Sequence, residues 1–143
     1  MFCDIKAIIL KKSPKRNLKF MTQRSVQGQI GEQLATEYCL KRGYKIIDQN
    51  WRSKAPRGEI DIIARDGNTL VFIEVKAVAP HADFLPEDHL TPAKLQRVAR
   101  LAFAYLNQIH QTDRAYRIDL IAITLNPGSP DLRHYENAVT DTY

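Results

Sequence analysis

The fold of this chain is decided by residues 58–76, which read GEIDIIARDGNTLVFIEVK. Two apolar segments rich in β-branched residues, 60–64 and 70–75, indicate β-strands. Between them, Gly67-Asn68 is a two-residue hairpin signal in which the first position takes a positive φ. We therefore predict an antiparallel hairpin in which the residues flanking this pair, 66 and 69, face each other.

This register places charged residues together on one face of the hairpin. Asp61 comes to lie opposite Glu74, and Glu59 opposite Lys76, with Cβ atoms of directly opposed residues about 4.5–5.5 Å apart. The other face is apolar throughout, so the hairpin is expected to lie centrally in a sheet covered on both sides. Its members are Ile60, Ile62, Ala64, Val71, Ile73 and Val75.

Two opposed carboxylates repel each other, and a divalent cation between them would reverse that effect. Magnesium takes oxygen ligands from one or two carboxylates together with water. Asp61 and Glu74 are thus predicted metal ligands, with the Val75 carbonyl as a third. Two alternatives stay open: a three-residue loop with a bulge would separate the carboxylates, and Glu59–Lys76 could be a simple salt bridge with Asp61 exposed at a strand end.

The remaining elements follow from periodicity and from helix-capping residues. An apolar stripe predicts a first helix over 26–42 that ends at Gly43, and its glycines Gly28 and Gly31 suggest close packing against a neighbour. Thr91-Pro92 is an N-cap followed by proline, which starts a second helix running to about residue 110. Further strands are expected over 44–52, 116–125 and 132–135. The expected fold is α/β, a mixed central sheet flanked by helices in the order αβββαββ, with one right-handed βαβ crossover.

The net charge of +5 comes entirely from residues 1–20, which hold six basic side chains and one acidic one. The remaining 123 residues hold 15 of each sign. We expect a basic N-terminal tail over 1–20, either disordered and touching phosphates or an artefact of the start site, with Met21 the true first residue, and a single domain over 21–143. Cys3 and Cys39 match no metal or redox spacing, and no apolar run spans a bilayer. A cytoplasmic location without membrane attachment is expected.

The motifs of this chain resemble, in order, those of the PD-(D/E)XK nuclease superfamily, nearest its Holliday-junction resolvase-like branch. More closely, the chain resembles the YraN-like family of uncharacterised bacterial proteins. The resemblance covers about residues 25–140 and rests on Gly28-x-x-Gly31-Glu32, Gly43-Tyr44, Asn50-Trp51-Arg52, Gly58-Glu59-Ile60-Asp61, residues 71–76, Lys94 and Arg117-Ile118-Asp119.

The resemblance implies a restriction-endonuclease-like core that binds nucleic acid. It places Glu32, Asp61, Glu74 and Lys76 at catalytic positions, and Glu32 completes the set of expected metal ligands, for Mg²⁺ or Mn²⁺. Expected nucleic-acid contacts are Arg52, Lys94, Arg97 and Arg117, although the commoner role of residues such as Lys94 and Arg97 is a solvated basic flank. The family commonly has an arginine at the position of Val78, so one phosphate contact is missing here.

Three functions are weighed on these grounds. The first is a magnesium-dependent endonuclease acting on branched or structured DNA, with RNA as the alternative substrate. The second is a non-catalytic nucleic-acid-binding module on a nuclease-like fold, and the third is a protein-interaction module. A homodimer is expected only by analogy with junction-cutting enzymes. The neutral charge of residues 21–143 counts against tight non-specific binding to nucleic acid.

Overall fold

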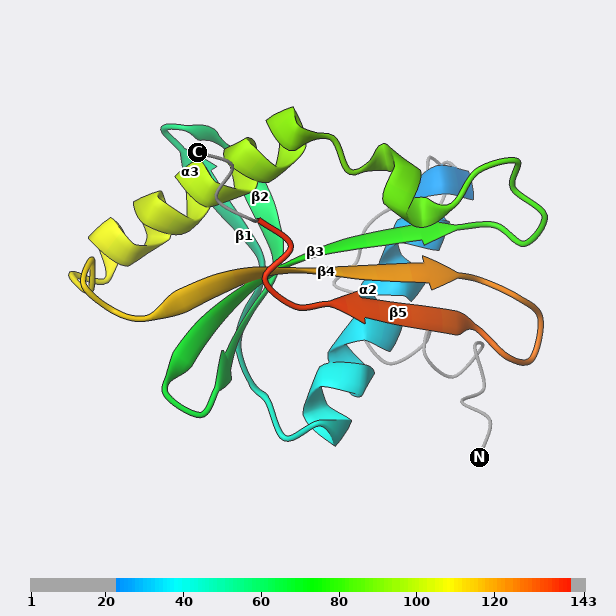
Figure 1. The fold of residues 1–143 in the computed structure, drawn as a ribbon, viewed down its shortest axis with the longest axis horizontal. Helices are drawn as coiled ribbons and strands as arrows, with labels where there is room; N and C mark the ends of the chain where they lie inside the picture. The colour runs from blue at the N-terminus through cyan, green and yellow to red at the C-terminus, as the bar shows by residue number, and fades with distance from the viewer. Residues whose placement is uncertain (1–22, 140–143) are drawn as a thin grey trace, which may run out of the picture.

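The computed structural model describes residues 23–139 and has the predicted order of elements (Figure 1). Each predicted helix and strand is present within a few residues of its expected bounds. The elements are α2 (Gln23–Lys41), β1 (Lys45–Lys54), β2 (Arg57–Asp66), β3 (Thr69–Val78), the short 3-10 helix η2 (Pro86–His89), α3 (Pro92–Gln108), β4 (Tyr116–Thr124) and β5 (Asp131–Tyr135). The expectations about the basic tail over 1–20 and about Met21 lie outside these residues.

The β2–β3 hairpin has the predicted register. Asp66 pairs with Thr69, and Gly67 takes the positive φ of 57° that a first-position glycine allows. The ladder then runs back through four further pairs to Ile62 and Ile73. The turn chemistry therefore fixed the pairing of the two strands, and the bulged three-residue loop is excluded.

The five strands form one mixed sheet in the order β1-β2-β3-β4-β5. Strand β4 runs parallel to β3, joined to it through α3, and the other neighbours are antiparallel. Figure 1 shows α3 and α2 on opposite sides of this sheet. The chain thus has the expected α/β fold, consistent with a restriction-endonuclease-like core.

Two apolar clusters, one on each face, hold the helices to the sheet. Phe72 and Leu101 belong to the cluster under α3, where Tyr105 meets the rings of Trp51 and Phe72 edge to face. Ala35 belongs to the cluster under α2. Burial of both faces explains why the central strands are apolar on both sides.

The sheet divides between β2 and β3. Pairing of these strands stops at Ile62–Ile73, whereas β1–β2 pairing continues to Lys54–Arg57 and β3–β4 pairing to Val78–Thr124. Figure 1 shows the β1–β2 pair turning away from the rest of the sheet. A fork therefore opens on the far side of the hairpin from its turn.

The fork corrects the predicted assignment of faces. Strict alternation puts Ile60 with Ile62 on the α2 side, but Ile60 packs in the cluster under α3 while Ile62 packs under α2. No backbone pairing joins Asp61 to Glu74, and Asn50, beside this point on β1, has a φ of 55°. The twist of β1–β2 changes which way the side chains point beyond Ile62.

Helix α2 crosses the sheet closely at Gly31. A Cβ atom at this position would lie 2.5 Å from the Cβ of Ala77 on β3, so only glycine fits without a shift. A Cβ atom at Gly28 would meet open space, so the expectation of close packing at Gly28 was wrong. Gly31 thereby brings the following residue, Glu32, close to the fork. No helix within residues 23–139 is long and apolar enough to cross a membrane.

Candidate active site

The Asp61 carboxylate lies at the point where β2 and β3 separate. Its Oδ2 accepts a hydrogen bond of 2.7 Å from the Val75 amide, replacing the ladder bond that the strands no longer make. The residue is 9% exposed, so it is not the strand-end surface charge of the alternative interpretation. In a strand the N–H and C=O of one residue point to the same edge, so the Val75 carbonyl also faces the fork.

Burial and neighbouring charge both disfavour ionisation of Asp61. Together they raise the pKa of Asp61 from 3.8 to about 8, with burial the larger cause and the charge of Glu74 next. The Val75 hydrogen bond opposes the rise, and Glu32 and Glu59 add to it. A buried carboxylate with further carboxylates around it is an environment that a cation would stabilise.

Glu74 lies on β3 next to the fork, beside a cationic side chain. The Nζ of Lys94, in the first turn of α3, lies 3.4 Å from its Oε1. The Thr91 N-cap, whose Oγ1 accepts a hydrogen bond from the Lys94 amide at 3.2 Å, fixes where this turn begins. Helix α3 therefore delivers a positive charge to the candidate site.

Glu32 approaches the same carboxylates from α2. Burial raises the pKa of Glu32, a hydrogen bond from Asn50 lowers it, and the charges of Glu59 and Glu74 raise it again. Asn50 belongs to a motif quoted above, but its sequence context gave it no role. Asn50 contacts Glu32 from a left-handed backbone conformation, which asparagine tolerates better than most residues.

The predicted register placed Glu59 opposite Lys76, but the two residues do not pair. Glu59 lies across from Arg52 on β1, and the Arg52 Nε is 3.3 Å from its Oε2. The reason is again the fork, because β2 stays with β1 after it leaves β3. Glu59 therefore lies on the outer arm of the fork.

Lys76 follows Glu74 by two residues on β3, about 6.6 Å along the strand. Its backbone pairs with Ala122 of β4, and its side chain is partly buried. Val78, where the resemblance led us to expect an arginine, is buried. Helix η2 lies on β3 and β4 beyond this point and is held to β5 by a hydrogen bond of 2.7 Å from the Tyr135 hydroxyl to Glu87.

The expected metal fits this site in part. Among residues 23–139, no three His, Cys, Asp or Glu side chains converge closely enough to enclose an ion by themselves. A magnesium ion bound through one or two carboxylates with water does not need three. Asp61 and Glu74, with the Val75 carbonyl, supply suitable hard oxygen ligands at a buried position that needs positive charge.

The four expected nucleic-acid contacts occupy different environments. Lys94 pairs with Glu74, and Arg97, one turn further along α3, donates to the Arg57 carbonyl at 3.2 Å and is exposed. Arg52 is also exposed beside Glu59. Arg117 is mostly buried on the α2 side of the sheet.

The guanidinium group of Arg117 is fully engaged by protein partners. It bonds Asp66 at 3.0 Å, Asp119 at 3.1 Å and the Tyr44 hydroxyl at 2.6 Å. Asp119 is completely buried and also bonds His134 at 2.8 Å. This network anchors β5 and explains why Arg117-Ile118-Asp119 stands out in the sequence.

The same chain matches one family model over most of its length. Residues 31–123, which include the fork, α3 and the strand after it, match the model described as "Uncharacterised protein family UPF0102". The chain belongs to the UPF0102 family. This confirms the resemblance to YraN-like proteins drawn from the motifs.

Curated relatives agree with this family assignment. A UPF0102 protein of Geobacter sulfurreducens is 40% identical over 82% of this chain and 91% of its own length. Another, from Herpetosiphon aurantiacus, is 43% identical over 79% of this chain and 93% of its own. A third, from Syntrophus aciditrophicus, is 40% identical over 75% of this chain and 83% of its own. These names carry the family and no activity.

Proposed function

We propose that this UPF0102 protein is a metal-dependent endonuclease that hydrolyses phosphodiester bonds in branched or structured DNA. The observation that carries the proposal is the position of Asp61, a carboxylate buried at the fork beside Glu74. This position raises the pKa of Asp61 to about 8. Strongly perturbed carboxylates are more frequent at functional sites than in structural cores. The nuclease-like fold supports the same conclusion by analogy.

Asp61 and Glu74 would hold Mg²⁺ or Mn²⁺, with the Val75 carbonyl and water. Such an ion, when bound, polarises a phosphate and lowers the pKa of a coordinated water. The Val75 amide holds the Asp61 carboxylate in a fixed orientation through its hydrogen bond. This fixed orientation keeps one oxygen engaged and leaves the other for a ligand.

Lys76 and Glu32 have supporting roles in this proposal. Lys76 is on β3, two residues past Glu74, where its ammonium group suits positioning the attacking water or stabilising charge on the phosphate. Glu32, held by Asn50, suits a contact to the outer water shell of the ion rather than a direct bond. The Lys94–Glu74 ion pair would exchange for contacts to the cation and to the substrate phosphate.

A non-catalytic nucleic-acid-binding module is the second candidate. One observation favours it: Lys94 already neutralises Glu74, and a lysine so placed is a substitute for a cation. In this alternative the site binds phosphate through α3 and needs no metal. The two candidates make different predictions about cleavage.

The deciding experiment is a cleavage assay with purified protein. Four-way junctions, forks, single strands and duplexes of DNA, and their RNA counterparts, are incubated with Mg²⁺, Mn²⁺ or EDTA. We expect metal-dependent cleavage of a branched or structured DNA. Glu74→Gln and Lys76→Ala should each reduce its rate by about 100-fold or more.

Matched controls remove the same kinds of charge elsewhere. Glu136→Gln changes an exposed carboxylate, and Lys41→Ala an exposed lysine at the end of α2. Both should cleave like the unaltered protein. Cleavage that survives Glu74→Gln and Lys76→Ala would come from a contaminant, and absence of cleavage on every substrate would favour the binding module.

A further inference from the structure

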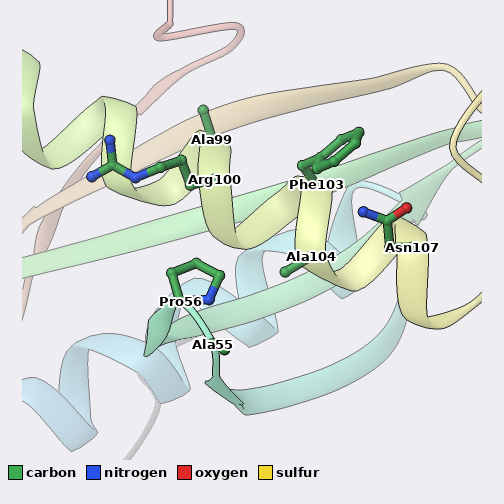
Figure 2. Close-up of a pocket in the computed structure, with 7 residues that line it drawn as sticks. All are labelled: Ala55, Pro56, Ala99, Arg100, Phe103, Ala104 and Asn107. Atoms are coloured by element: carbon green, nitrogen blue, oxygen red, sulfur yellow. The ribbon is translucent and has the colours of Figure 1, made fainter.

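A groove runs between α3 and the connection from β1 to β2. Its volume is about 620 Å³, and it is lined by Arg100, Phe103, Ala104 and Asn107 together with Ala55 and Pro56. Figure 2 shows the first four along α3, with Ala104 pointing toward the connection. None of the candidate catalytic carboxylates lies in this groove.

The two segments beside the groove carry basic side chains and no acidic ones. Residues 23–139 carry 15 Lys and Arg side chains and 14 Asp and Glu side chains, which are nearly balanced. Residues 49–58 and 92–108 together hold six of the basic side chains and none of the acidic ones. The segments on either side of the groove therefore carry only positive charge, although the described chain is almost neutral.

Most of these six charges have no acidic partner. Arg52 pairs with Glu59, and Lys94 with Glu74. The other four form no salt bridge with any residue in the described part of the chain, and all four are exposed: Lys54, Arg57, Arg97 and Arg100. Exposed, unpaired arginines suit bidentate contacts to phosphate.

Phe103 supplies an aromatic surface within this basic region. The Phe103 side chain is 54% exposed, because it lies on the face of α3 opposite the face that packs into the core. Arg100 is three residues earlier on the helix and Asn107 four residues later, so both are its neighbours on the helix surface. An exposed aromatic ring between basic side chains is the arrangement that binds unstacked bases along a single strand.

Helix α3 connects the groove to the candidate active site. Lys94 reaches Glu74, Arg97 reaches the Arg57 carbonyl, and Asn107 lies about 20 Å further along the helix than Lys94. Gly58 lets the β1–β2 arm lie against this helix, since a Cβ there would come within 2.9 Å of Leu101. A strand held in the groove would thus extend from the fork.

We propose that this groove binds a single-stranded segment of nucleic acid. A base stacks on Phe103, the Asn107 amide hydrogen-bonds a base edge, and phosphates lie against Arg100 and, one turn earlier on α3, Arg97. The proposal rests on the proposed function for its link to the fork, and it names the substrate class: nucleic acid with an unpaired strand adjoining the scissile site. The positive charge of α3 beside the groove, with no acidic side chain among the lining residues, selects a polyanion over an apolar partner.

Binding without metal tests the groove independently of cleavage. Fluorescein-labelled oligothymidylate of 20 nucleotides, its uridylate counterpart and a 20-base-pair duplex are titrated in EDTA, with fluorescence anisotropy as the readout. Phe103→Ala should weaken binding of both single strands about 10-fold and of the duplex much less, while Phe103→Tyr keeps the stacking surface and the affinity. Arg100→Ala should lower the salt dependence by about 0.7 in the slope of log K against log salt.

The chain offers matched controls outside the groove. Phe84 is an exposed phenylalanine in the loop after β3, and Arg114 is a partly exposed arginine after α3. Phe84→Ala and Arg114→Ala should bind like the unaltered protein. Unchanged melting temperatures confirm that the variants fold, and residues 1–20 are common to all of them.

Three results would contradict the proposal that this groove binds single-stranded nucleic acid. If Phe103→Ala leaves the affinity for single strands unchanged, no base stacks on Phe103. If it weakens duplex binding equally, the groove does not prefer unpaired strands. Displacement of oligothymidylate by polyglutamate at equal charge concentration would point to an acidic protein partner. If Phe103→Ala weakens binding but the unaltered protein never cleaves, the single-strand proposal stands and the nuclease proposal fails. If the unaltered protein and Phe103→Ala both cleave with the same KM, the nuclease proposal stands and the single-strand proposal fails.

Discussion

The Asp61 carboxylate replaces a backbone carbonyl as the partner of the Val75 amide, 2.7 Å away, at the point where two neighbouring strands part. One side chain thus ends the ladder and enters the candidate metal site. The same burial that lets it cap the ladder raises its pKa to about 8. Stability, protonation and metal binding should therefore be coupled at this residue.

The pH dependence of stability provides the first prediction. The folded protein holds the Asp61 proton up to about pH 8, whereas the unfolded chain releases it near 3.8. The folded state therefore binds more protons between these values, and stability falls as pH rises through that window. In EDTA, Asp61→Asn should match the unaltered protein near pH 4 and be the more stable near pH 8. Urea denaturation across this range measures the difference, and parallel curves would contradict it.

Divalent metal should raise the melting temperature. Binding to the folded state alone stabilises by RT ln(1 + [L]/Kd), about 2.7 kcal/mol at 100 times Kd. The shift with Mg²⁺ or Mn²⁺ should be larger at pH 8 than at pH 6, because protons compete for Asp61. Asp61→Asn should reduce it strongly. Asp113→Asn, an exposed carboxylate in the loop after α3, serves as the control and should retain it.

Lys94 should compete with the metal and assist the nucleic acid. Its ammonium lies 3.4 Å from Glu74, so Lys94→Gln frees that carboxylate. Without nucleic acid, the variant should bind Mn²⁺ more tightly, as followed by calorimetry. Its affinity for oligonucleotides in EDTA should fall and show a flatter salt dependence. Unchanged affinity for both ligands would return Lys94 to a solvated basic flank.

The contact of Gly31 with Ala77 predicts a compensating pair. Gly31→Ala places a methyl group 2.5 Å from the Ala77 Cβ, and such overpacking costs about 1–3 kcal/mol. The gain in helix propensity of up to about 1 kcal/mol offsets only part of this cost. Adding Ala77→Gly should restore part of the loss, and Gly28→Ala, with open space around it, should not destabilise. Chemical denaturation of the unaltered protein, of Gly31→Ala and Ala77→Gly alone, and of the double variant shows the coupling as non-additivity.

The buried Asp119–Arg117 pair should contribute strongly to stability. Asp119 is fully buried, and Asp119→Ala leaves the largely buried Arg117 and His134 without their shared partner. Breaking one side of such a pair costs about 3–5 kcal/mol. Asp113→Ala, on the surface, should stay within about 0.5 kcal/mol of the unaltered protein. Arg117→Ala should behave like Asp119→Ala in denaturation, while a selective loss of nucleic-acid affinity in a stable Arg117→Ala variant would support the original expectation of a phosphate contact.

Local chemistry accounts for most of what the sequence predicted correctly. The Gly67-Asn68 turn set the strand register, and Thr91-Pro92 set the start of α3, because each acts over a few residues. Apolar runs gave the order of the elements for the same reason. The faces of β2 beyond Ile62 were mispredicted because alternation assumes an unbroken ladder. Nothing in the local sequence indicates that β2 stops pairing with β3 at Ile62 while it continues to pair with β1.

The sequence alone determined the hairpin, the order of its elements and the membership of Asp61, Glu74 and Lys76 in one charged region. Only the tertiary structure decided what surrounds them: the fork that buries Asp61, the helix that brings Lys94 to Glu74, and the network that encloses Arg117. It also decided that two segments with six basic and no acidic side chains flank one groove in a nearly neutral chain. Turn and helix-cap chemistry acts between neighbours in sequence, whereas burial and charge depend on contacts between residues far apart along the chain.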